Sequence, residues 1–241
     1  MLKLTLFTIF SAIFCAETCY GLDIKKCKEE DIKCVTANSQ ALYDLTIKGD
    51  PNLEIEPADP IYHNSIDGNL SIIKYTLTNT SITGYKKCKL NYAQLSLAKS
   101  FLEFNLLCPE IQVHGLYEID GRLIVLPVQG KGDFKLDARR YNITIHAEIK
   151  TVNGNDGKSY LAVKNFNINA DIIDGIDFDL TNLFNGQKEL AEPVLQFARE
   201  NWKEVAKELQ GPILNIAIKR LIKNLNKLLK TVPVDQMLIS N

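Results

Sequence analysis

The C-terminal part of the chain carries the pattern that most restricts its fold. From Gln187 to Val232, apolar residues recur with the three- and four-residue spacing of an amphipathic helix. They are Leu190, Val194, Phe197, Val205, Leu209, Ile213, Ile216, Leu221, Leu225, Leu228 and Val232. At about 1.5 Å per residue, one helix over this range would be about 65–70 Å long, more than an ordinary globular core requires. Pro212 lies inside the range and predicts a kink there.

A second apolar stripe widens the face of this helix. Its members are Leu214, Ile218, Ile222 and Leu229. A helix on the surface of a core needs only one stripe of about 100°. We therefore expect an α+β fold in which a strongly curved antiparallel β-sheet wraps the long C-terminal helix. Wrapping a sheet around a rod can leave a lengthwise apolar cavity. The alternative is that the two apolar faces simply pack on each other.

The residues before the helix alternate between apolar and polar, as half-buried strands do. The clearest case is the strand in which one face carries Tyr141, Ile143, Ile145, Ala147 and Ile149. Similar alternation over 101–106, 111–120 and 165–172 predicts an antiparallel meander. A hairpin turn is predicted at 153–157, where two glycines and two asparagines cluster.

The remaining segments have weaker patterns. A helix is predicted over 31–48, with Asp31 as its cap and Gly49 at its end. We expect a loop over 177–186 and little regular structure in the tail, 234–241.

The first 21 residues resemble a secretory signal peptide. Lys3 gives a positive start, and the run from Leu4 to Ala16 is apolar but too short to span a bilayer. Cleavage after Gly21 leaves residues 22–241, with no repeat and no sign of a second domain. We therefore expect a secreted, extracellular protein of one domain. The alternative is that the first residues form a buried helix.

Signal cleavage would leave four cysteines, an even number that predicts two disulfides in an oxidising compartment. Three pairings are possible. We favour Cys27–Cys34, which closes a short loop before a helix. We also favour Cys88–Cys108, because a hairpin turning near Ala98 would place these two residues opposite each other. A metal site is the alternative, but the usual Cys-x-x-Cys spacing does not occur.

Three Asn-x-Ser/Thr sequons begin at Asn69, Asn79 and Asn142. In a secreted chain each is a candidate glycosylation site. Asn142 lies on the polar face of the clearest strand, which favours a glycan there.

The sequence carries no catalytic signature. It has no nucleophile elbow, no phosphate loop and no His-Glu-x-x-His pair, and His114 and His146 fall on outward strand positions. A net charge of −1 without a basic patch gives no indication of nucleic-acid binding. An ester hydrolase is one alternative, but Ser71 and Ser96 qualify only as serines. We therefore expect neither an enzyme nor a metal or cofactor site.

Several segments resemble the insect takeout family, which also contains the haemolymph juvenile-hormone-binding proteins. The most specific is Pro109–Gly132, PEIQVHGLYEIDGRLIVLPVQGKG, with its tyrosine, its Gly-x-Leu-x-x-Leu-Pro run and its paired glycines. The resemblance covers nearly the whole mature chain. The other segments that resemble the family are Cys27–Cys34, Ile47–Pro51, Pro57–Pro60, Asn79–Gly84 and Glu200–Pro233.

This resemblance implies a tubular lipid-binding fold and a carrier that is not an enzyme. The implied ligands are juvenile hormone, other terpenoids or long-chain lipids. The Cys27–Cys34 disulfide is implied directly. A Cys88–Cys108 disulfide departs from the pattern, because the hormone binders place their second bridge further along the chain. We therefore favour a takeout-like member.

The leading hypothesis is a secreted carrier that holds a hydrophobic small molecule in an internal apolar tunnel. The expected wall residues are Phe104, Val113, Tyr117, Ile143 and Ile145 on the strands, and Ile213, Ile216, Ala217 and Leu221 on the helix. Tyr117 could also offer its hydroxyl to a ligand oxygen. We expect a monomer that is not an integral membrane protein. The alternative is a secreted interaction protein that acts on a cell-surface receptor or a membrane surface without a bound ligand.

Overall fold

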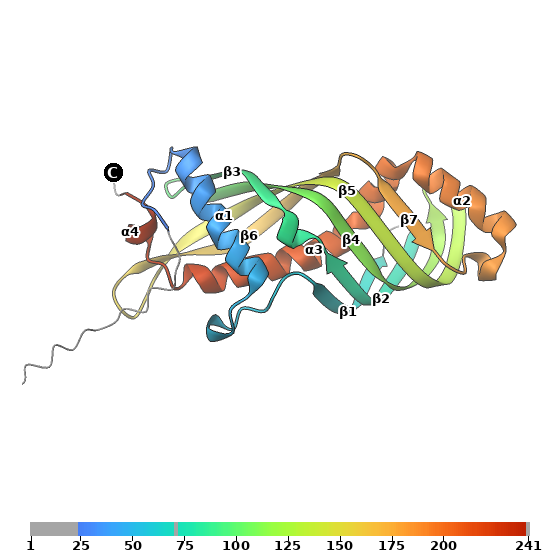
Figure 1. Cartoon of the computed structure of the whole chain (residues 1–241), viewed down its shortest axis with the longest axis horizontal. Helices are drawn as coiled ribbons and strands as arrows, with labels where there is room; N and C mark the ends of the chain where they lie inside the picture. The colour runs from blue at the N-terminus through green and yellow to red at the C-terminus, as the bar shows by residue number, and fades with distance from the viewer. Residues whose placement is uncertain (1–23, 70–71, 240–241) are drawn as a thin grey trace, which may run out of the picture.

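The structure is a computed structural model and describes residues 24–69 and 72–239. The signal peptide expected over 1–21 lies outside the described residues. Helix α3 (Trp202–Leu229) runs along the length of the molecule, and the sheet curves around it (Figure 1). The expected α+β fold, a curved antiparallel sheet wrapped around a long C-terminal helix, is confirmed.

The prediction of one unbroken helix was wrong. Helix α2 (Lys188–Glu200) and α3 are separate, and the break is at Asn201, whose φ and ψ are −111° and 33°. The side-chain amide and the backbone N–H of Asn201 both donate to the carbonyl of Phe197, each at 2.9 Å, which closes the last turn of α2. Helix α3 continues through Pro212, where we had expected the irregularity.

Seven strands form one antiparallel sheet in the order β1-β2-β4-β5-β6, with β3 beside β4 and β7 beside β5. Their bounds are β1 Ile61–Asn69, β2 Ile73–Thr83, β3 Lys89–Ser96, β4 Phe101–Leu123, β5 Leu126–Asn153, β6 Ser159–Ile172 and β7 Ile176–Leu180.

Strands β4 and β5 are so long, at 23 and 28 residues, that each takes two shorter neighbours along one edge. β3 pairs with the first part of β4, and β2 pairs with the later part. Likewise β7 and β6 share one edge of β5. The sheet is therefore not the simple meander that the sequence predicted. The expected loop at 177–186 contains most of β7 and the 3₁₀ turn η3 (Phe184–Gly186), because Ile176 and Phe178 supply a short apolar face.

The clearest predicted strand is confirmed. Tyr141, Ile143 and Ile145 are buried, as are Ala147 and Ile149, while His146, Glu148 and Lys150 between or beside them are exposed. The predicted hairpin turn at 153–157 joins β5 to β6. The inward side chains of the sheet and the apolar side of α3 belong to one hydrophobic core.

Helix α1 (Ile32–Lys48) closes one end of the molecule, opposite α2 (Figure 1). Asp31 caps it by accepting from the backbone N–H of Cys34, and Gly49 follows its last residue, as predicted. The amide of Ala93 in β3 donates to the hydroxyl of Thr36 at 2.8 Å, which ties α1 to the sheet edge. The 3₁₀ turn η1 (Pro51–Leu53) follows α1, and η2 (Tyr85–Lys87) joins β2 to β3.

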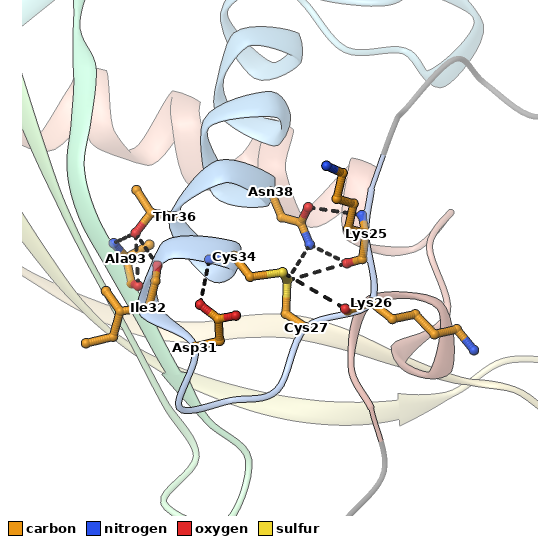
Figure 2. The surroundings of a disulfide bond; sticks show 9 residues. All are labelled: Lys25, Lys26, Cys27, Asp31, Ile32, Cys34, Thr36, Asn38 and Ala93. Atoms are coloured by element: carbon orange, nitrogen blue, oxygen red, sulfur yellow. Dashed lines mark hydrogen bonds between the residues drawn. A yellow bond between two sulfur atoms is a disulfide. The ribbon is translucent and has the colours of Figure 1, made fainter.

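Both favoured disulfides are present, Cys27–Cys34 and Cys88–Cys108. Figure 2 shows the first, where the Asn38 side chain donates to the Lys25 carbonyl at 2.7 Å. The tail is more regular than we expected. It forms α4 (Val234–Met237), and Leu238 pairs with Cys27 in a parallel bridge. The tail therefore packs beside the disulfide loop.

Candidate functional site

The interior between the sheet and α3 contains two cavities. Cavity 1, of about 100 Å³, lies at the α1 end and is lined from α1, β3, β4, β5, β6, α3 and the tail. Cavity 2, of about 110 Å³, lies toward α2 and is lined from β2, η2, β4, β5, β6, β7 and α3. Apolar side chains form nearly all of both walls.

Closely packed residues separate the two cavities on three elements. On β4, Phe104 lines cavity 1 and Ile111 lines cavity 2, while Leu106 and Cys108 between them line neither. On β5 and α3 the intermediate residues follow the same pattern. We call this group the partition, and its members are Leu106, Cys108, Ile143, Ile145, Ala217 and Ile218, each 0% exposed. The partition thus lies between the two cavities in the interior where the sequence analysis expected a tunnel.

The predicted wall residues fall into three groups. Phe104 and Leu221 line cavity 1, and Val113, Tyr117 and Ile213 line cavity 2. Ile143, Ile145 and Ala217 belong to the partition. Ile216 is half-buried and lines neither cavity. Most of these residues are buried, and their role as ligand contacts stays a prediction.

The hydroxyls in cavity 2 are mostly engaged by the protein itself. Tyr117 donates to the carbonyl of Thr181 at 2.6 Å, and Tyr75 donates to the carbonyl of Leu209 at 2.7 Å. Tyr141 donates to the Gln210 side chain at 2.5 Å. Burial raises the pKa of Tyr117 to about 12, so the phenol is neutral at ordinary pH. The Tyr117 hydroxyl that we expected to be available to a ligand is therefore already a donor to the backbone.

The side chains that line the two cavities are uncharged. Within the described part of the chain, the residues that line the two cavities include no Lys, Arg, His, Asp or Glu. The polar members of cavity 1 are Asn38, Ser39 and Thr46, all on α1. The described residues also bring no three metal-ligating side chains together.

The main titratable cluster lies on the outer face of the sheet, away from the cavities. Glu103 accepts from Tyr92 at 2.8 Å and from Gln94 at 3.0 Å, and its other oxygen lies 2.5 Å from Nδ1 of His146. Burial alone would raise the pKa of Glu103, but these hydrogen bonds and the charge of His146 outweigh it and lower the pKa. His114 and His146 are both exposed, as predicted from their strand positions.

The sequons differ in their surroundings. Asn69 and Asn79 are exposed, whereas Asn142 is half-buried. The side-chain oxygen of Asn142 accepts from the amide of Asn105 at 2.7 Å, and Asn105 is buried. The Asn142 side chain thus contributes to a hydrogen-bond network on the sheet.

A long helix wrapped by a curved sheet around apolar cavities is the geometry that the comparisons with known proteins can test. A model of the family described as haemolymph juvenile hormone binding protein matches residues 5–239. The chain belongs to this family.

Individual relatives support the same assignment. The circadian clock-controlled protein daywake of Drosophila melanogaster is 28% identical over 229 residues, which cover 88% of this chain and 86% of the relative. Its counterpart in Drosophila yakuba is 27% identical over 226 residues, with the same coverage. The crystal structure of takeout 1 from Epiphyas postvittana superposes with a TM-score of 0.83 at 28% identity, covering 90% of this chain and 100% of that one. The takeout-like character of this family member is therefore shown.

Some residues that line the cavities were not anticipated from the sequence. Leu42, Tyr43 and Thr46 of α1 face cavity 1, together with Met237 and Leu238 of the tail. Tyr85 lines cavity 2, in the short turn η2. The apolar side of α1 was visible in the sequence, but nothing in it indicated that α1 and the tail close the same end of the interior. No helix among the described residues is long and apolar enough to cross a membrane.

Proposed function

We propose that this family member is a secreted carrier that holds one hydrophobic small molecule in its apolar interior. The proposed ligand class comprises juvenile hormone, other terpenoids and long-chain lipids. The observation that carries the proposal is the pair of apolar cavities between the sheet and α3, walled by residues without charge.

Affinity in such a site comes mainly from desolvation of the ligand. Burial of apolar surface contributes about 25 cal/mol per Å². A charged or unpaired polar wall would oppose binding, whereas the engaged tyrosine hydroxyls of cavity 2 present mainly their rings to a ligand. Phe104 and Leu221 would contact the ligand in cavity 1, and Val113, Tyr117 and Ile213 would contact it in cavity 2. For a ligand that extends through both, Ile143, Ile145, Ala217 and Ile216 are the proposed contacts around the partition.

The two disulfides support the extracellular location that this role requires. A carrier that leaves the cell passes through an oxidising compartment, where both bridges form and persist. We propose a monomer in solution, with the ligand enclosed by a single chain.

Displacement of a fluorescent fatty-acid probe tests the proposal. The mature protein is first stripped of co-purified lipid, and the probe is then displaced by juvenile hormones, farnesoids, fatty acids and their esters, and quinones. We expect displacement at sub-micromolar concentration by one of these classes. Failure of the stripped, folded protein to bind any probe or ligand would overturn the carrier and favour the interaction protein.

A cavity-filling variant locates the binding. Ala138 lines cavity 2 and is buried, so Ala138→Leu adds side-chain volume where the ligand would lie. We expect an affinity loss of about tenfold, equivalent to about 1.4 kcal/mol. Ala37→Leu is the matched control, because Ala37 is exposed on α1, and it should bind as the wild type does. Equal affinity of both variants would place the ligand outside cavity 2.

A further inference from the structure

The turn that joins β4 to β5 consists of apolar, β-branched residues. Leu123 pairs with Leu126, so Ile124 and Val125 are the two turn residues of this hairpin. Ile124 has a φ of 56°, in the left-handed region that a β-branched residue rarely adopts, and Val125 is 55% exposed. Two-residue hairpin turns normally place glycine or asparagine where φ is positive. The turn therefore keeps two apolar side chains that neither its backbone geometry nor its contact with water favours.

The other long hairpin of the same sheet has an ordinary turn. Strands β5 and β6 are joined through Asn-Gly-Asn-Asp-Gly at 153–157, and there the positive φ of 76° belongs to Gly157. The β5–β6 turn lies at the α4 end of the molecule, whereas the β4–β5 turn lies at the α2 end (Figure 1). The apolar turn is thus a feature of one end of the molecule and is not general to its hairpins.

A third apolar side chain lies beside this turn. The backbone N–H of Arg122 donates to the carbonyl of Ile72 at 2.8 Å, and Ile72 is 51% exposed. We call Ile72, Ile124 and Val125 the apolar tip. The tip is at the end of two long strands and forms no groove, so it fits a deformable surface into which side chains can insert, such as the headgroup region of a lipid bilayer.

The polar groups of the turn also suit a lipid surface. The guanidinium of Arg122 donates to the carbonyl of Val125 at 2.9 Å, so this turn carbonyl has a donor within the protein and loses less when water is removed. From residue 121 to residue 132 the chain has two cations, Arg122 and Lys131, and no acidic residue. Cations beside exposed apolar side chains favour an anionic lipid surface.

We propose that the apolar tip docks on an anionic phospholipid surface, with its three side chains inserted among the headgroups and Arg122 beside a phosphate. Docking places the α2 end of the interior, toward which cavity 2 lies, against the lipid. An apolar ligand then exchanges with the lipid without crossing bulk water. The exchange step rests on the proposed carrier function, whereas docking itself requires no ligand.

Sedimentation with large unilamellar vesicles tests the docking of mature protein stripped of ligand. The vesicles are made of phosphatidylcholine, with or without phosphatidylserine. We expect half of the protein to be bound near about 1 mM lipid, which is weaker than anchoring by a single acyl chain. Phosphatidylserine should strengthen binding by about threefold, because a cation near an anionic surface contributes to binding.

Two variants remove the apolar character of the tip. Val125→Asp should weaken vesicle binding by about tenfold or more, because it places a charge where the side chain inserts. The double variant Ile124→Gly with Val125→Ser forms an ordinary two-residue turn. It should weaken binding by a similar factor and leave the Tm equal to or above that of the wild type, because glycine adopts a positive φ without strain.

Val152→Asp is the matched control, because Val152 is 42% exposed near the turn at the other end of β5. It should bind vesicles as the wild type does. If the wild type binds neither kind of vesicle, or if the double variant binds as tightly as the wild type, docking through the tip is wrong. An equal loss of binding in Val152→Asp and Val125→Asp would also overturn it, because the contact would then not be specific to the tip.

Transfer of the fluorescent fatty-acid probe from protein to vesicles separates docking from the carrier function. With docking, the transfer rate should rise with vesicle concentration, and Val125→Asp should slow transfer by about tenfold while its affinity for the probe in solution stays unchanged. A transfer rate that is independent of vesicle concentration would overturn exchange at the lipid surface. If stripped protein binds no probe, the carrier function fails, and the sedimentation result still decides whether the tip docks.

Discussion

The hydroxyl of Tyr75 on β2 donates a hydrogen bond to the backbone carbonyl of Leu209 on α3, at 2.7 Å. Leu209 lies three residues before Pro212, whose missing N–H leaves the carbonyl of Glu208, not that of Leu209, without its helical donor. The phenol thus adds a donor from the sheet next to the irregular part of the helix. It also links the sheet to the helix that it surrounds.

We predict that Tyr75→Phe lowers the free energy of unfolding by about 1 kcal/mol, because a part-buried hydrogen bond between the sheet and the helix is lost while the ring remains. Urea unfolding followed by far-UV circular dichroism measures this. Tyr62→Phe removes an exposed hydroxyl from the neighbouring strand and should stay within about 0.5 kcal/mol of the wild type. Equal stability of the two variants would contradict a stabilising role for the bond.

The partition between the cavities gives a second prediction. Ile145 is 0% exposed, and Ile145→Ala should cost about 2–5 kcal/mol, the usual range for a truncated core side chain. The space that this truncation opens lies between cavities 1 and 2, so longer ligands should bind with higher affinity. We expect the ratio of affinities for an eighteen-carbon and a ten-carbon methyl ester to rise relative to that of the wild type.

Probe displacement by the two esters measures this ratio, and urea unfolding confirms that the variant is folded at the assay temperature. Ile173→Ala is the control, because Ile173 is 41% exposed and lies outside the interior. An unchanged ratio in a folded Ile145→Ala protein would mean that the partition does not limit the length of the ligand.

The sequence predicted the two faces that meet in the interior but not the space between them. Periodicity identifies inward residues such as Ile143 and Ala217, because side-chain direction follows from a repeat of two or 3.6 residues. It does not say whether opposing side chains touch. At the partition they fill the interior, whereas near Val113 and Phe104 they leave cavities.

Two other features of the fold have no periodic signal in the sequence. The division of the long helix falls at Asn201, whose φ of −111° and ψ of 33° are not helical. The bridge between Cys27 and Leu238 joins the two ends of the described chain, and no local pattern indicated that the tail would fold there. The hairpin of β3 and β4, by contrast, was predictable, because its turn lies midway between Cys88 and Cys108.

The Glu103 cluster predicts an acid-sensitive contribution to stability. The folded-state pKa of Glu103 is lowered, so its contribution is fully present above the pKa of the unfolded chain, about 4.3, and disappears as the pH falls through the lower folded value. Glu103→Gln should therefore be less stable than the wild type at pH 7, and the difference in Tm should shrink as the pH falls from 5 toward 3.

Differential scanning calorimetry across this pH range measures the difference in Tm directly. Subtracting the Tm of Glu103→Gln from that of the wild type at each pH removes the effect of the other carboxylates. Glu118→Gln is a suitable control, since its side chain is 66% exposed in a surface ion pair with Lys131. A difference between Glu103→Gln and wild type that stays constant with pH would exclude the ionised carboxylate as its source.

The exposed sequon at Asn79 gives the last prediction. Asn79 lies in β2 where the register with β4 shifts, it has a φ of 50°, and it is exposed, so a glycan attached there can extend into solvent. Protein secreted from insect cells should lose mass on treatment with an N-glycosidase, and Asn79→Gln should remove one glycan from the intact mass.

At the Asn142 sequon we expect the side chain itself to contribute to stability. Asn142→Gln should lower the stability even of unglycosylated protein from bacteria, by about 1 kcal/mol, because the buried Asn105 amide loses a well-placed acceptor at 2.7 Å. Equal Tm values for unglycosylated Asn142→Gln and wild type would show that this side chain is free to serve only as a glycan acceptor.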